Sequence, residues 1–152
     1  MSFIALLVLS LAANVVLVRK LFVGNTQVIE GDSRISIVVS QPNRDFVMSE
    51  MRNFVETLHQ INIGIEQNDS SLIVEAARSS GGSVAHHAPA GLIASIPMGF
   101  KTIGFDTHAK FDSIANSAEK NFDPIVTQQQ VTALLGNCVA CHRSYRMDVK
   151  KD

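Results

Sequence analysis

The sequence has little of several residue types, and these shortages narrow what the chain can be. Among 152 residues there is no tryptophan, one tyrosine and only two cysteines, too few for a four-cysteine zinc site. The formal net charge is −1 and charged residues make up 18%, so no basic stripe indicates nucleic acid. The length fits one domain that can bury a sizeable core. We expect no nucleic-acid partner.

The two cysteines lie near the C-terminus in the sequence Cys138-Val139-Ala140-Cys141-His142. Cys-x-x-Cys-His is the attachment signature of a c-type haem. Each thiol adds across a haem vinyl group to form a thioether, and the histidine becomes an axial ligand of the iron. Because the motif uses both cysteines, none remains for a disulfide. The sequence therefore predicts one covalent haem c held by Cys138, Cys141 and His142.

Cys-x-x-Cys also occurs in thioredoxin-like redox proteins and as half of a zinc site. A thioredoxin-like protein needs a strand before the motif and βαβ units around it, whereas the flanks here have a helical pattern. A zinc site needs further ligands, and His59, His86, His87 and His108 are scattered along the chain. Both alternatives stay open, but the context favours haem.

The longest apolar run lies at the N-terminus. Residues 3–18 are apolar apart from Ser10 and Asn14, and the run continues after Arg19 and Lys20. Read as one helix, this segment would be about 33 Å long, enough to cross a hydrocarbon core of roughly 30 Å. The sequence therefore predicts a helix that can span a membrane.

A cleaved signal peptide is the alternative for this segment, but it normally has a basic n-region and a small-residue cleavage site. Here the n-region is only Met1-Ser2, and no Ala-x-Ala site follows. We therefore expect residues 1–23 to be a retained transmembrane anchor. Because haem c is attached outside the cytoplasm, the expected place is the bacterial inner membrane, with the following domain facing the periplasm. Arg19 and Lys20 would then snorkel to the outer interface, against the positive-inside rule.

Residues 24–42 have the composition of an extended connector. Glycines and polar residues predict turns at its start and middle, and Pro42 disfavours helix at the residue before it. The stretch from Arg34 to Ser40 is β-branched and partly alternating, which predicts an extended strand. Because the rest is helical, we expect this lone strand to lie along the helices as an apolar strap or to dock on another subunit.

Residues 43–152 have the pattern of four helices in one domain. Apolar residues at intervals of three and four predict helices over 43–67, 70–78, 97–120 and 124–147. Asp123 followed by Pro124 is a helix start, whereas residues 83–96 fit either a short helix or a loop. One stripe of the last helix holds Val131, Leu134, Cys138, Cys141 and Tyr145. Because this stripe faces the other helices and carries both cysteines, the sequence predicts an all-α fold with the haem inside the bundle.

Four helices with the haem motif on the last one resemble the cytochrome c-prime class, whereas ordinary small cytochromes c carry the motif near the N-terminus. The run from Cys138 through His142 to Tyr145 and Arg146 is similar to that class, which commonly has an aromatic and a basic residue after the motif. On its third helix the class often has a tryptophan followed by a phenylalanine. Here Phe105 stands in place of the tryptophan, and Phe111 is the phenylalanine. The resemblance covers residues 42–147 and implies an up-and-down four-helix bundle, often a homodimer.

The resemblance implies that the sixth coordination position of the iron faces the first helix of the bundle. Low-spin members of the class have a methionine ligand there, whereas five-coordinate members bind small gases. Met51 is the expected ligand and Met48, one turn earlier, is the alternative, although methionine is also common core filler. Ligation of the iron by a second histidine is a further alternative. Among the candidate histidines, His108 is expected to lie on an exposed face and so away from the haem.

Arg146, one turn past His142, is the first choice for pairing with a haem propionate, because a guanidinium matches a carboxylate bidentately. We expect an electron-transfer protein rather than an enzyme. Its role would be to carry single electrons between or within membrane respiratory or photosynthetic complexes, with redox proteins or subunits as partners. One alternative is a five-coordinate protein that binds nitric oxide or carbon monoxide beside Met51, Met48 and Val55. Another is a structural haem subunit of a larger membrane assembly.

Overall fold

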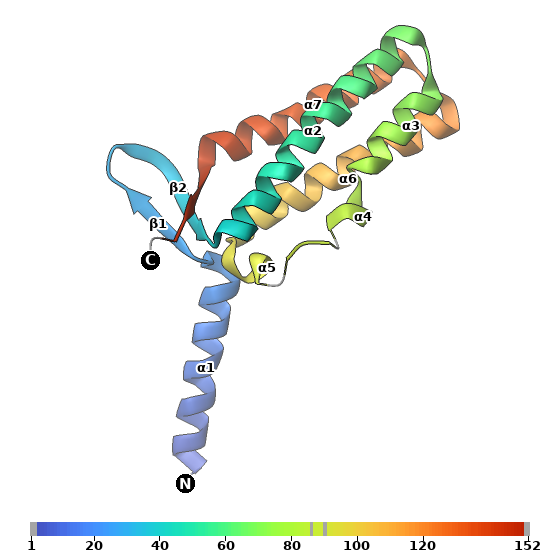
Figure 1. Ribbon diagram of the computed structural model, residues 1–152. Coiled ribbons are helices and arrows are strands. Elements are labelled where there is room, and N and C mark those ends of the chain that lie inside the picture. The colour runs from blue at the N-terminus through green and yellow to red at the C-terminus, as the bar shows by residue number, and fades with distance from the viewer. Residues whose placement is uncertain (1–2, 86, 90, 151–152) are drawn as a thin grey trace.

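The computed structural model describes residues 3–85, 87–89 and 91–150, and most of them are helical (Figure 1). In chain order the elements are α1 (Phe3–Val23), β1 (Thr26–Ile29), β2 (Asp32–Val39), α2 (Gln41–Gln67), α3 (Ser70–Ser79), α4 (Gly82–Ala85), α5 (Leu92–Ser95), α6 (Met98–Asn121), α7 (Pro124–Ser144) and β3 (Tyr145–Val149). The predicted long helices are confirmed. The expectation of an all-α chain is wrong, because the three strands form a sheet.

The helices α2, α3, α6 and α7 pack around one apolar core. Its fully buried side chains come from all four helices and include Ile61, Ile73, Phe111, Ile114 and Leu134. Local sequence sets where these helices begin. The Asp123 side chain accepts from the backbone N–H groups of Ile125 and Val126, as predicted for the start of α7.

The helix α2 begins at Gln41, two residues earlier than expected. Ser40 is its N-cap and accepts from the backbone N–H of Asn43. Pro42 lies in the first helical turn, where a missing backbone N–H leaves no hydrogen bond unmade. Its presence therefore marks the start of the helix rather than the end of a connector.

The helix α1 projects away from the other elements (Figure 1), and none of its residues is buried. Among the described residues it is the one helix long and apolar enough to cross a membrane, a property that anchors and signal sequences share. The chain leaves α1 through Gly24, which has a φ of +65° and whose Cβ, if present, would lie 2.5 Å from the Ser95 carbonyl oxygen. Asn25 then donates its backbone N–H to that oxygen at 2.8 Å. The end of α1 is therefore attached directly to the end of α5.

The sheet has the strand order β1-β2-β3, with β1 antiparallel and β3 parallel to β2. The strand predicted from Arg34 to Ser40 is confirmed as β2, but the expectation that it is a lone strand is wrong, because it has a partner on each side within the same molecule. The last helix also ends at Ser144 instead of Met147, because residues 145–149 are extended and pair with β2. Pairing buries Ile37 and Val39 in a second apolar cluster with Val47 of α2 and Leu92 of α5.

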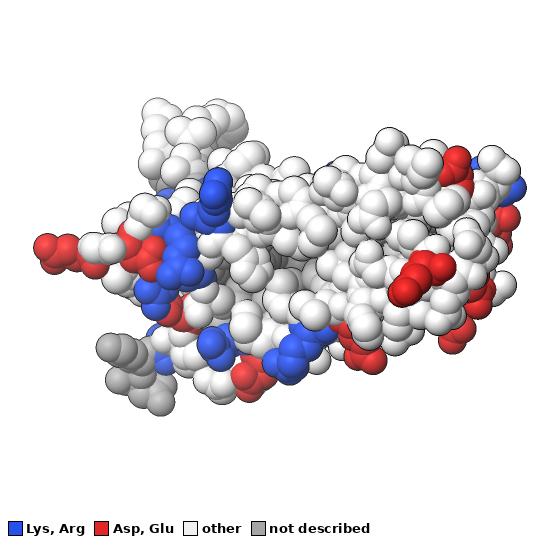
Figure 2. Space-filling model, turned by 90° about the horizontal axis from the view of Figure 1, so that it is seen from above, with Lys and Arg blue, Asp and Glu red and all other residues white. Residues whose placement is uncertain are grey.

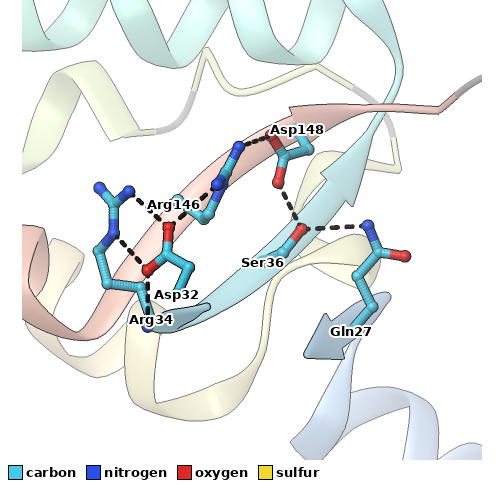
Figure 3. A network of polar contacts seen from close by, with 6 residues as sticks. All are labelled: Gln27, Asp32, Arg34, Ser36, Arg146 and Asp148. Carbon is cyan, nitrogen blue, oxygen red and sulfur yellow. Dashed lines mark hydrogen bonds and ion pairs between the residues drawn. The ribbon is translucent and has the colours of Figure 1, made fainter. Parts of the chain in front are cut away.

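A network of charged side chains joins β2 to β3 (Figure 3). Asp32 accepts from Arg34 Nη2 at 2.7 Å and from Arg146 Nη1 at 3.0 Å. Asp148 accepts from Arg146 Nη2 at 2.7 Å and from Ser36 Oγ at 2.6 Å. Because Arg146 follows His142 by four residues, the network fixes the chain just after α7 to the hairpin beside α1.

The network predicts an acid-sensitive contribution to stability. Hydrogen bonds from Arg34, and then from Arg146, hold the pKa of Asp32 well below its usual range, and Arg146 lowers the pKa of Asp148 in the same way. Because the folded-state pKa of Asp32 is depressed, its contribution is present above the unfolded value of about 3.9 and is lost as pH falls further. We expect Asp32→Asn to be less stable than the wild type in urea at pH 7, and the difference to become smaller as the pH is lowered from 4 to 2.

The matched control for this substitution is Glu30→Gln, on the exposed turn of the same hairpin. The described structure assigns Glu30 no ion pair, so its variant should follow the wild-type pH dependence. If the free energies of unfolding of Asp32→Asn and Glu30→Gln have the same dependence on pH across the acid range, the network makes no specific contribution to stability.

Candidate functional site

A mainly apolar pocket lies at the end of the helices nearest α1 and the sheet. It has about 850 Å³ of space, part of it open to solvent. The walls are the first halves of α2 and α6, the short helix α5 and the last turns of α7. Its apolar lining includes Phe46, Val47, Met51, Phe54, Leu92, Ile93, Ile96, Phe100, Ile103 and Phe105.

The structure brings the predicted attachment residues together on one wall of this pocket. Cys138, Cys141 and His142 all line it from the last two turns of α7. Both cysteines are free thiols of intermediate burial, and Cys138 also packs against the helical core. The pocket therefore combines two accessible thiols, an imidazole and a large apolar wall, which is the donor set that a covalent haem needs.

The chemistry of the thiols argues against a reactive dithiol. Burial raises the pKa of Cys138, and burial together with the charge of Cys138 raises the pKa of Cys141 to about 11. Redox-active cysteines instead have a lowered pKa, often at the positive N-terminal end of a helix. Here the motif lies at the C-terminal end of α7, where the helix dipole disfavours a thiolate.

The described residues also offer no ready zinc site. No group of three or more His, Cys, Asp and Glu side chains in ranges 3–85, 87–89 and 91–150 is arranged to hold a metal ion. His59 and His87 are exposed, and His86 lies outside the described residues. Neither alternative to haem attachment gains support from the geometry.

The two candidate methionines of α2 have different surroundings. Both pack against the second apolar cluster beside the sheet, but Met51 also lines the pocket and Met48 does not. Val55, grouped with them as a lining residue of a gas pocket, is wrong in that role because it points away from the pocket and is 69% exposed. Among the side chains that sequence analysis put forward on α2, the geometry therefore singles out Met51.

His108 is not on an exposed face, and this prediction is corrected. Its side chain lines the pocket and meets Phe54 edge-on, with ring centroids 5.1 Å apart. His108 Nδ1 lies 2.8 Å from the Ser80 carbonyl oxygen. A carbonyl can only accept, so Nδ1 is the donor of this hydrogen bond. Sequence analysis missed this because the contact with α3 that buries His108 is not local.

The remaining predicted residues lie around the pocket or outside it. Phe105 lines the pocket with 51% of its side chain exposed, so it forms part of the rim. Tyr145 packs edge-on against Phe100 at a centroid distance of 5.6 Å and does not line the pocket. Arg146 is held by Asp32 and Asp148 on β3 and does not line it either.

Two charged residues of the pocket wall were not predicted. Glu50 lines it from α2, and Lys101 lines it from α6 with only 6% of its surface exposed. A lysine near the start of a helix normally indicates a solvated face. No feature of the sequence signals that this one is covered by the end of α1.

Charge is unevenly distributed over the molecule. In Figure 2, Lys and Arg gather toward the left, which is the sheet-bearing end, and Asp and Glu predominate at the other end. The basic residues at the sheet end include Arg34, Arg44, Arg143 and Arg146, and the acidic residues at the opposite end include Glu66, Asp69, Glu119 and Asp123. The helix α1 emerges from the sheet-bearing end (Figure 1), where Arg34 and Arg146 are paired with Asp32 and Asp148.

The chain matches no family model, no curated protein and no solved structure. Its function is therefore inferred from the chemistry of the site.

Proposed function

We propose that this chain is a membrane-anchored, monohaem c-type cytochrome of the cytochrome c-prime class that transfers single electrons. One observation carries the proposal: Cys138, Cys141 and His142 line a single apolar pocket together with Met51 of the facing helix. Two thiols followed by an imidazole, all opening onto an apolar cavity, are what covalent haem attachment requires. The raised thiol pKa values support this use of the cysteines over a redox dithiol.

Each pocket residue has a role in this proposal. The thiols of Cys138 and Cys141 would each add S–H across a vinyl double bond of the haem, so that a C–S bond forms, hydrogen goes to the neighbouring carbon and no oxidant is needed. His142 and Met51 would hold the iron of the bound haem. When bound, a haem supplies reversible one-electron exchange at its iron. The apolar wall excludes water and holds the cofactor at a fixed orientation.

The position of the pocket suits electron exchange near a membrane. In this proposal α1 crosses the bacterial inner membrane and the remaining residues lie in the periplasm. The contacts of Gly24 and Asn25 with Ser95 then hold the pocket close to the membrane surface, because α5 forms both the junction and a pocket wall. Tethering also raises the effective concentration of a membrane-bound redox partner.

The visible spectrum of the full chain, produced in cells that attach haem c, tests the proposal. We expect a low-spin haem whose bands do not move when carbon monoxide is added, because Met51 occupies the sixth position. Met51→Ala should become high-spin, bind carbon monoxide and have a lower reduction potential. Met48→Ala is the matched control on the same helix and should behave as the wild type.

Other spectra would assign the iron differently. A wild-type haem that binds carbon monoxide at once would favour the five-coordinate gas-binding protein. A low-spin spectrum that survives Met51→Ala and is lost in His108→Ala would give the sixth position to His108. A chain without haem would contradict the proposed function altogether.

A further inference from the structure

Lys101 is a buried cation in the wall of the pocket. It is 6% exposed, and its Nζ donates to the backbone carbonyl oxygen of Leu21, in the last turn of α1, at 2.9 Å. An ammonium group has three N–H donors. Among the described residues no carboxylate lies within ion-pair distance of Lys101, although Glu50 lines the same pocket.

A buried ammonium is stable only when charge and hydrogen bonds are matched. The Leu21 carbonyl satisfies one donor and supplies the partial negative charge of a helix C-terminus, not a full counter-charge. Lys110, on the same helix, shows the ordinary arrangement: it is more exposed and pairs with Asp106 one turn earlier. The contrast indicates that the pocket itself lacks an anion beside Lys101.

We infer that Lys101 is the anion-binding residue of the pocket, which holds the carbonyl end of α1 and a carboxylate of the bound haem at once. This inference rests on the proposed function. Haem carries two propionate carboxylates, and Arg146, the residue first expected to bind one, is occupied by Asp32 and Asp148. One side chain then joins the cofactor to the membrane helix, so the haem and α1 keep a fixed relative position.

The test uses the full chain in detergent micelles, with Lys101→Met, Lys101→Arg and the control Lys110→Met. Covalent haem is measured first, on the denatured chain. Reduction potential and the propionate bending bands in the resonance Raman spectrum are then compared. In Lys101→Met we expect haem to remain attached, the propionate bands to shift, and the ratio of reduced to oxidised haem to fall about tenfold, which is about 59 mV for one electron.

The variants separate the outcomes. Lys101→Arg should retain most of the wild-type potential because it keeps the charge, and Lys110→Met should change neither readout. If Lys101→Met does not fold, the arginine variant still tests the role, since its different donor geometry should shift the propionate bands. If the haem-bearing variants have unchanged propionate bands, Lys101 only caps the C-terminal end of α1 and binds no propionate. A wild-type chain without haem would instead overturn the proposed function itself.

Discussion

Replacing Cys138 and Cys141 together by alanine is expected to abolish covalent haem completely. Each thioether needs its own sulfur, and the chain has no other cysteine. Each single substitution leaves one thiol and should leave a haem attached through one bond. The mass of the denatured chain, together with haem staining after denaturing electrophoresis, distinguishes the three variants from the wild type.

The fold should survive this double substitution. Both cysteines are only of intermediate burial, so removing two sulfur atoms leaves no large closed cavity. The double variant and the wild type, both produced without haem and purified, should therefore have nearly equal helix contents by circular dichroism. A wild-type chain that carries zinc or a reversible disulfide in place of haem would contradict the assignment and return the motif to the alternatives that the sequence left open.

Features encoded by neighbouring residues could be predicted from the sequence. Asp123 and Pro124 start α7, because a cap and a proline act on the helical turn in which they lie. The placing of Cys138, Cys141 and His142 on one helix is likewise local, and so is the apolar run that forms α1. That Met51 faces inward could also be predicted, because its place on the inward stripe of α2 follows from helical periodicity; its role as an iron ligand stays a prediction.

The sheet could not be predicted because its pairing is not local. Ser36 and Asp148, which form a hydrogen bond, are 112 residues apart in the chain. Tyr145 continues the helical spacing of Cys138 and Cys141, so the end of α7 seemed to lie further on than Ser144. Only pairing with β2 makes the extended conformation of residues 145–149 the better choice.

The missed pocket residues have the same explanation. His108 and Lys101 are polar, and sequence patterns assign polar residues to solvated faces. Their burial depends on partners far along the chain: the carbonyl of Ser80 for His108 and that of Leu21 for Lys101. Each pairs a titratable side chain with a backbone acceptor at the end of another helix, an arrangement that no periodicity reveals.

Helical periodicity separates Phe105 from Phe111, two of the phenylalanines of α6. The resemblance names Phe105 and Phe111 together, yet six residues along a helix turn the side chain by about 240°. Accordingly Phe111 is fully buried and Phe105 is 51% exposed. Phe111 belongs to the core of α2, α3, α6 and α7, where it lies 5.3 Å from Phe54 between ring centroids. Phe105 lies at the pocket rim.

This difference predicts a large effect of Phe111→Ala on stability. Removing a fully buried phenylalanine leaves a cavity and should lower the free energy of unfolding by about 3–5 kcal/mol. The matched control Phe105→Ala, on the same helix, should cost less than about 1 kcal/mol because its ring is half in solvent. Urea unfolding of the full chain in micelles, followed by circular dichroism, measures both. Because Phe111 does not line the pocket, its variant should keep covalent haem and the wild-type spectrum under native conditions. Equal losses of stability would show that the two rings are equally buried, contrary to the packing of α6.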